Sequence, residues 1–205
     1  GPTGVELAGA LAEMKKYIFP KDYPELDLKN MHIALYEASP KLLTGMSNFS
    51  SEKALSYLKK LGVEVYLNTS VTDYNGEELF LSDGTTIRSK TVVWSAGVIA
   101  NTCKGIDPKN LANGNRIIVD RYNRIKGFDN IFVLGDQCYM ETPLYPKGHP
   151  QVAQTAIQQA LNLANNISRM ASSKAMKEFE YKDKGSMATI GRNLAVADLP
   201  SIKLG

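Results

Sequence analysis

Several residue types and patterns are scarce in this 205-residue sequence, and each scarcity removes a class of function. Cys103 and Cys138 form no CxxC pair and lie near no histidine cluster, so the sequence predicts neither a metal site nor a redox disulfide. Basic residues form no run and the net charge is only +3, so no nucleic-acid partner is expected. No stretch approaches the roughly 20 consecutive apolar residues of a membrane span, and no signal peptide is recognisable.

What the chain does contain is 43% hydrophobic residues, enough to bury a core, and helical patterns that alternate with short apolar runs. Apolar residues at helical spacing over 3–17 predict a helix, and Pro20 and Pro24 are expected to prevent it from continuing. A second helix is expected over 52–61, with Ser50 and Ser51 as its capping residues. Both helices have the amphipathic pattern of elements that cover one face of a sheet.

Strands are expected between and after these helices. Asp83-Gly84 is a frequent tight-turn pair and predicts a hairpin within 77–89. Trp94 is expected to be a core residue. The other expected strands cover 31–38, 63–68 and 91–97. This order of elements is typical of a doubly wound α/β domain.

The pattern restarts after Asn101, with strands expected over 116–120 and 130–136 and a long helix over 150–170. The second of these strands ends in Gly135-Asp136, a position where open α/β sheets bind ligands. The helix carries an apolar stripe formed by Ala153, Ala156, Ile157, Ala160, Leu161, Ala164 and Ile167. The predicted domains are 1–101, 102–171 and 172–205.

The first residues, GPTGVELAGAL, suit a tight turn that enters a helix and binds an anion at its N-terminus. Gly1 and Gly4 would give a pyrophosphate access to backbone N–H groups, and Thr3 adds a hydroxyl. Glu37, at a strand end, is placed to bind a ribose 2′-hydroxyl and to repel a 2′-phosphate, which selects NADH. Each site has an alternative explanation. The glycines would form only a turn at a helix cap, Glu37 would be a solvated glutamate, and Glu6 would stabilise the first helical turn. Gly135-Asp136 would be an arbitrary turn.

Four separated stretches, GPTGVELAGAL, LYEASPKLL, NIFVLGDQ and AQTAIQQA followed by GSMATIGRNLAVADL, resemble the type II NADH:quinone oxidoreductases, which are two-dinucleotide-binding flavoproteins. The resemblance covers nearly the whole chain. It implies an α/β fold in which an incomplete Rossmann-like NADH domain joins the C-terminal part of an FAD-binding domain. It also implies that the N-terminal FAD half, the first strand of the NADH domain and a C-terminal membrane anchor lie outside this chain.

The resemblance implies a role for each matching residue. Glu6 would face flavin and nicotinamide as the catalytic residue, while Ala96 and Gly97 would lie near the NADH cofactor. Asp136, with Gly135, would bind the ribityl chain and phosphates of FAD. Further residues beside the flavin ring and the quinone would be Ala153, Gln154, Gln158 and Gln159. Ile157 stands where many relatives carry histidine. His149, just before this helix, would either compensate for that missing imidazole or be a solvated loop residue.

The implied activity is electron transfer from NADH through FAD to a membrane quinone, although the isolated chain is expected to be inactive. The resemblance implies that the parent protein is peripheral to the cytoplasmic face of a bacterial inner membrane and that it forms a homodimer. A segment outside this chain would attach it to the membrane, and the chain itself would be soluble. Two alternatives remain open from the sequence. One is an FAD- and NAD-dependent disulfide or ferredoxin reductase, and the other is an NAD-binding module without catalysis.

Overall fold

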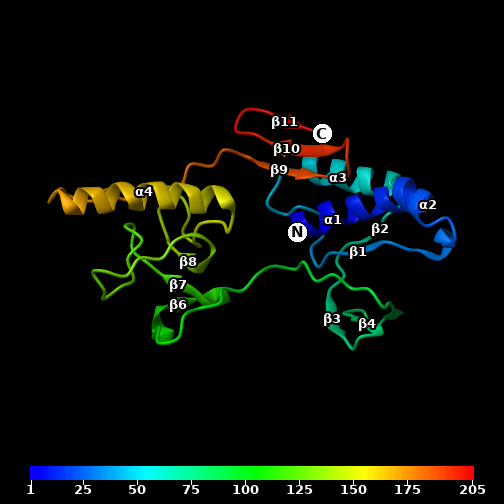
Figure 1. Ribbon diagram of the computed structural model, residues 1–205, viewed down its shortest axis with the longest axis horizontal. Coiled ribbons are helices and arrows are strands. Elements are labelled where there is room, and N and C mark those ends of the chain that lie inside the picture. The colour runs from blue at the N-terminus through cyan, green and yellow to red at the C-terminus, as the bar shows by residue number, and fades with distance from the viewer. The chain divides into compact units, whose positions relative to one another are not determined.

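The computed structural model describes residues 1–205 and divides them into two compact units (Figure 1). Unit 1 consists of Gly1–Gly97 together with Gly185–Gly205, and unit 2 is Val98–Lys184. The last residues of the chain therefore return to the first unit. The functional domains expected from the sequence have other boundaries and stay a prediction.

Helix α1 (Pro2–Glu13) begins unit 1, with Gly1 as its N-cap and Pro2 at the first helical position, where a missing N–H has no cost. The expectation that Pro20 stops helical structure is wrong, although α2 (Phe19–Asp22) ends before Pro24. A π-helical turn, Met14–Ile18, follows α1 directly and leads into α2. Pro20 lies in the first turn of α2, where its ring is tolerated, so helical structure continues past it.

Helix α3 (Asn48–Lys60) confirms the second predicted helix but starts earlier than expected. The cap is Ser47, whose Oγ accepts a hydrogen bond of 3.2 Å from the amide of Ser50. Ser50 and Ser51 are buried inside the first turn instead. The helix ends before Gly62, which has φ +85°, a conformation that glycine adopts without strain.

Two strands form the only parallel pair of unit 1. Strand β1 (Ala34–Tyr36) pairs with β2 (Glu64–Tyr66), and Leu35 lies opposite Val65. The strand expected over 91–97 is not formed, because this stretch has no ladder partner. Trp94 is consequently 65% exposed, so its prediction as a core residue is wrong.

Two antiparallel sheets complete unit 1. The predicted hairpin is confirmed as β4 (Glu78–Leu81) and β5 (Thr86–Arg88), and β3 (Val71–Tyr74) pairs with the other edge of β4. The second sheet has the order β11-β10-β9. Its strands are β9 (Ser186–Thr189), β10 (Ala195–Asp198) and β11 (Lys203–Leu204).

The core of unit 1 lies around α1 and α3, which pack against each other and against both β1-β2 and β9-β10 (Figure 1). Val5, Ala54, Leu58 and Val196 have no exposed surface. Burial of an aliphatic side chain of this kind contributes roughly 1.5–3 kcal/mol. The C-terminal sheet is therefore an integral layer of the unit that contains the helix start.

Unit 2 is built on short strands and turns. Strand β7 (Arg116–Ile118) pairs with β6 (Leu111–Ala112) and with β8 (Cys138–Tyr139), in parallel with the latter. The strand expected over 130–136 is wrong: only an isolated bridge joins Phe132 to Arg124. Short 3₁₀ turns complete the unit at Pro108–Asn110, Asn113–Asn115 and Gly135–Gln137, as one does in unit 1 at Leu28–Asn30.

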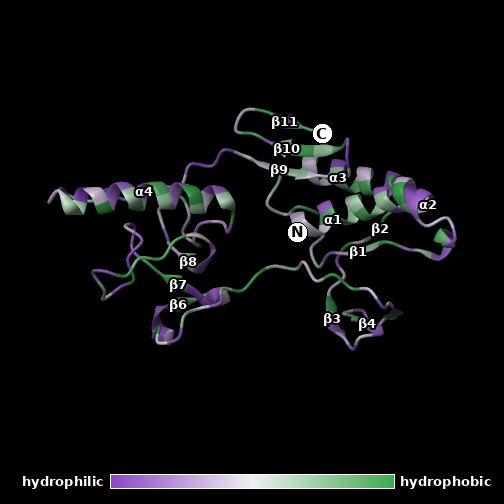
Figure 2. Ribbon diagram, viewed as in Figure 1, coloured by the Kyte–Doolittle hydropathy of each residue, from purple (hydrophilic) through white to green (hydrophobic).

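Helix α4 (Ala153–Ala171) confirms the predicted long helix. Its buried residues are Thr155, Gln159, Leu163 and Asn166, three of them polar. The predicted apolar stripe is exposed except at Ala156, with Ile157 at 60% and Leu161 at 62%. Figure 2 shows the mixed hydropathy along this helix. No helix of the chain has the length and apolar character needed to cross a bilayer.

Candidate functional site

The start of α1 has the geometry of a phosphate-binding turn. A Cβ atom added to Gly1 would meet no atom within 4 Å. A Cβ on Gly4 would lie 2.8 Å from Ser95 Oγ and 3.3 Å from Leu35 Cδ1. Gly4 therefore permits close packing of the helix on its neighbours, the role of the third glycine in a dinucleotide fingerprint. Thr3 is exposed beside this turn.

Glu37 lies directly after β1, next to the helix start. Its Oε2 is 3.0 Å from the amino group of Gly1, and its Oε1 accepts a hydrogen bond of 3.0 Å from the Ser39 amide. Burial alone would raise the pKa of Glu37, but these donors hold the pKa below its ordinary value. The side chain stays ionised and 15% exposed, so a carboxylate and the glycine turn meet at one place.

Glu6 lies in the second turn of α1, not the first, because the helix already begins at Pro2. The helix dipole acts mainly within the first turn, so dipole stabilisation explains this residue less well than the sequence suggested. Its Oε1 accepts hydrogen bonds from the amide of Thr189, at 3.1 Å, and from Thr189 Oγ1, at 3.3 Å. Glu6 is therefore tied to strand β9.

Ala96 and Gly97 follow Ser95, the residue that touches Gly4, and both are exposed. Gly97 has φ +99°, which favours glycine over other residues. These two residues therefore lie on the stretch that packs against the start of α1, although that stretch is not a strand.

In unit 2, Gly135 and Asp136 form a 3₁₀ turn beside α4. Gly135 has φ +69°, and an added Cβ would lie 3.3 Å from the Cβ of Ala156. The amide of Gly135 donates to Gln159 Oε1 at 2.7 Å. Asp136 is exposed, so its carboxylate is not packed within a closed interior.

The glutamines of α4 are placed differently from one another. Gln159 is 1% exposed and pairs with Gly135 and with the thiol of Cys138, so its amide supports the Gly135 turn and does not face a substrate. Burial raises the pKa of that thiol to about 11. Gln158 pairs through both amide atoms with the backbone of Lys182, at 2.9 and 3.0 Å. Ala153 is exposed, and Gln154 is half-buried near it.

His149 is buried, contrary to the expectation of a solvated loop residue. Its ring lies among Tyr145, Phe179 and Tyr181, with centroid distances of 5.0, 5.3 and 6.0 Å. Neither ring nitrogen has a hydrogen-bond partner. Desolvation lowers the pKa of His149, which keeps the ring neutral near neutral pH.

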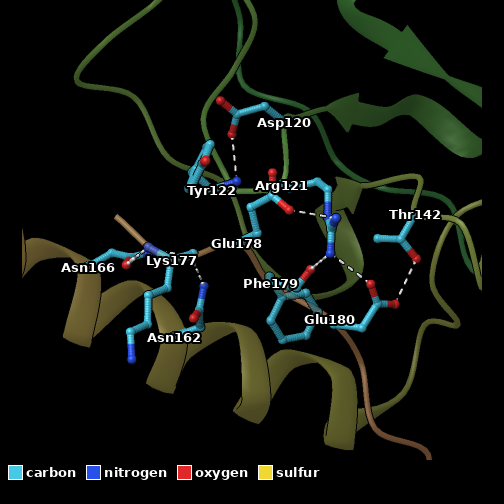
Figure 3. A network of polar contacts seen from close by, with 10 residues as sticks. All are labelled: Asp120, Arg121, Tyr122, Thr142, Asn162, Asn166, Lys177, Glu178, Phe179 and Glu180. Atoms are coloured by element: carbon cyan, nitrogen blue, oxygen red, sulfur yellow. Dashed lines mark hydrogen bonds and ion pairs between the residues drawn. The ribbon is translucent and has the colours of Figure 1, made fainter. Parts of the chain in front are cut away.

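Sequence reasoning missed the segment 177–182, which packs along the polar face of α4 (Figure 3). The guanidinium of Arg121 pairs with Glu178 at 2.6 Å and with Glu180 at 2.8 Å. Asn166 binds the backbone of Lys177 at both its N–H and its C=O. The alternation of charged and aromatic residues in KEFEYK was the available signal.

Residues 1–160 match the family model described as pyridine nucleotide-disulphide oxidoreductase, so the chain belongs to this family. The chain is 37% identical over 218 residues to the type II NADH:quinone oxidoreductase Ndh of Mycobacterium tuberculosis. It is 32% identical over 200 residues to that of Haemophilus influenzae. These alignments cover 99% and 97% of this chain but only 45% of each relative, so the chain spans less than half their length.

Solved structures show the same fold. NDH2 of Plasmodium falciparum, in complex with NADH, matches with a TM-score of 0.88 at 20% identity, over 100% of this chain and 57% of that one. A ferredoxin reductase of Rhodopseudomonas palustris matches with a TM-score of 0.63 at 19% identity, over 82% of this chain and 41% of that one. The predicted α/β class with a Rossmann-like part is thereby confirmed.

Proposed function

We propose that this chain is part of a flavoprotein that oxidises NADH and passes the electrons through FAD to a quinone. The observation that carries the proposal is the meeting of the glycine turn of α1 with the Glu37 carboxylate, 3.0 Å from Gly1, at the end of β1. The close packing at the buried Gly4 fits a helix N-terminus that binds a pyrophosphate. The similarity to type II NADH:quinone oxidoreductases supports the same assignment.

The residues of the NADH site would bind NADH and distinguish it from NADPH. Gly1, Thr3 and Gly4 would offer donors to the pyrophosphate, and Glu37 would accept hydrogen bonds from the ribose. An ionised carboxylate repels a 2′-phosphate, so NADH is selected over NADPH. Ala96 and Gly97 would flank the cofactor.

The flavin side would rest on the Gly135 turn, whose exposed Asp136 carboxylate is available to a ribityl hydroxyl. When bound, the cofactors supply the hydride donor and its acceptor. Glu6 would hold or move a proton at its carboxylate, while Ala153, Gln154 and Gln158 would line the quinone side. For Gln159 we retain only the supporting role that its burial favours.

The relatives that this chain matches are about twice as long as the chain, and the apolar stripe of α4 is exposed. A helix of a globular protein ordinarily turns such a stripe toward a core. We infer that a further part of the polypeptide covers Ile157 and Leu161. We also propose that the whole protein is a homodimer, attached peripherally to the cytoplasmic face of a bacterial inner membrane.

Cofactor selection by Glu37 tests the proposal directly. In the full-length protein, the rate of NADH oxidation with a quinone should exceed that with lipoamide or ferredoxin. The substitution Glu37→Gln should raise KM for NADH by about tenfold, the value of one charge-assisted hydrogen bond, and should narrow the preference over NADPH. Glu77→Gln, in the loop between β3 and β4, is the matched control. An unchanged NADH preference in Glu37→Gln would contradict the assignment.

The isolated 205-residue chain gives a second test. We expect it to bind NADH weakly and to retain no stoichiometric FAD, measured by fluorescence titration and by flavin absorbance after reconstitution. A purified chain that holds one FAD per molecule would refute the view that the flavin pocket needs more of the protein.

A further inference from the structure

The free edge of the C-terminal sheet faces the helix that contains Glu6. Strand β9 pairs only with β10, and the amide of Ile190 points inward to the carbonyl of Leu194, at 2.7 Å. The amide of the preceding residue, Thr189, therefore points to the other side, since N–H directions alternate along a strand. There it donates to Glu6 Oε1 at 3.1 Å.

Two further positions on the same side of α1 hold this segment. A Cβ on Gly9 would lie 2.8 Å from the backbone nitrogen of Gly191, so helix and backbone touch with no room for a side chain. The amide of Arg192 donates to Glu13 Oε2 at 2.7 Å. Glu6, Gly9 and Glu13 are spaced three and four residues apart, the spacing of one helix face.

The hydroxyl of Thr189 adds a second donor to the same oxygen of Glu6, at 3.3 Å. A glutamate side chain free in solvent samples many rotamers, and fixing them costs up to roughly 1.5–2 kcal/mol of conformational entropy. The two hydrogen bonds to Oε1 offset this entropy loss in the protein without a ligand. They also leave Oε2 available to a further donor.

We propose that Thr189 is a positioning residue, which holds Glu6 Oε1 through its amide and hydroxyl so that Oε2 is presented to the reacting groups. This role rests on the proposed function, in which Glu6 acts beside nicotinamide and flavin. It assigns to the C-terminal segment a part in the chemistry of a residue more than 180 positions earlier in the chain.

The contact itself is tested without cofactor by amide hydrogen exchange. Glu6→Ala should accelerate exchange of the Thr189 amide by about tenfold and leave the Arg192 amide within twofold. Glu13→Ala is the matched control and should have the reverse pattern. Equal effects of both substitutions on both amides would overturn the assignment of separate contacts, and with it the positioning role.

The functional role is tested in the full-length flavoprotein. Thr189→Val removes the hydroxyl at nearly constant shape, and kcat with NADH and quinone should fall roughly three- to tenfold, as for the loss of one hydrogen bond. KM for NADH should stay within twofold, and Thr189→Ser should restore kcat. Thr72→Val, which removes an exposed hydroxyl bonded to Phe80 O in the hairpin sheet, should change neither.

The possible failures are distinguishable. An unchanged kcat in Thr189→Val, with the wild type active, overturns the positioning role and leaves the proposed function intact. A kcat that falls equally in Thr189→Ser overturns it as well, because the hydroxyl is then not responsible. A wild-type flavoprotein that does not oxidise NADH overturns both proposals.

Discussion

Asn166 gives the sharpest test of how unit 2 is held together. Its side chain has no exposed surface, its Nδ2 donates to the carbonyl of Lys177, and its Oδ1 accepts from the amide of Lys177, both at 2.8 Å (Figure 3). Asn166→Ala removes both hydrogen bonds. Each is worth about 0.5–1.5 kcal/mol, so the expected loss in the free energy of unfolding is roughly 1–3 kcal/mol.

The neighbouring Asn165 is the matched control, because it is exposed on α4. Asparagine to alanine raises helix propensity by several tenths of a kcal/mol in both variants, and this gain cancels in the comparison. Urea unfolding measures the difference, and limited trypsin digestion should cut after Lys177 faster in Asn166→Ala. Equal unfolding free energies for the two variants would refute the reasoning that the paired amide secures this segment.

Three other perturbations have outcomes set by the structure. The pKa of His149 is lowered from 6.5 by desolvation, so protons bind the unfolded state better and stability should fall as the pH drops below about 6.5; His149→Phe should remove this dependence in urea unfolding. Gly9→Ala should lower the thermal midpoint of unfolding, because overpacking against the backbone costs about 1–3 kcal/mol. This cost outweighs the gain in helix propensity, which is about 1 kcal/mol. Gly45→Ala, with open space around it, should leave the midpoint unchanged. Asp198→Asn should destabilise unit 1 at neutral pH, since hydrogen bonds from Ser47 and Ser50 overcome burial and lower the pKa of this carboxyl; an unfolding midpoint equal to that of wild type would contradict this.

Local signals in the sequence predicted the elements that depend on local chemistry. The hairpin at Asp83-Gly84 and the stop at Gly62 follow from backbone conformations that glycine adopts readily, and the structure has them where expected. The glycine turn and Glu37 likewise lie together as the dinucleotide pattern indicated. The predicted cap of α3 lies three to four residues from the observed one, because several serines compete there and Ser47 is the one with the extended backbone dihedrals of a cap.

Features that depend on distant partners were not predictable in this way. A strand exists only when a second strand completes its ladder, and the apolar run 91–97 finds none within the chain. The periodicity of apolar residues located the stripe on α4, but it does not show which face of the helix packs against the rest of the chain. The burial of His149 depends on Phe179 and Tyr181, which reach it from a segment with no recognisable motif.

In each unit, the backbone of the C-terminal part of the chain forms hydrogen bonds with side chains of a helix. Its backbone amides and carbonyls pair with polar side chains of the helix that contains candidate site residues: Lys182 with Gln158 on α4, and Thr189 with Glu6 on α1. Backbone groups without a strand partner on that side would otherwise bond only to water, so helix side chains that pair with them select one register of the segment. A register shift of one residue would exchange inward and outward amides and leave Glu6 without its donor. The position of the candidate catalytic carboxylate is therefore set by strand register as well as by the helix on which it lies.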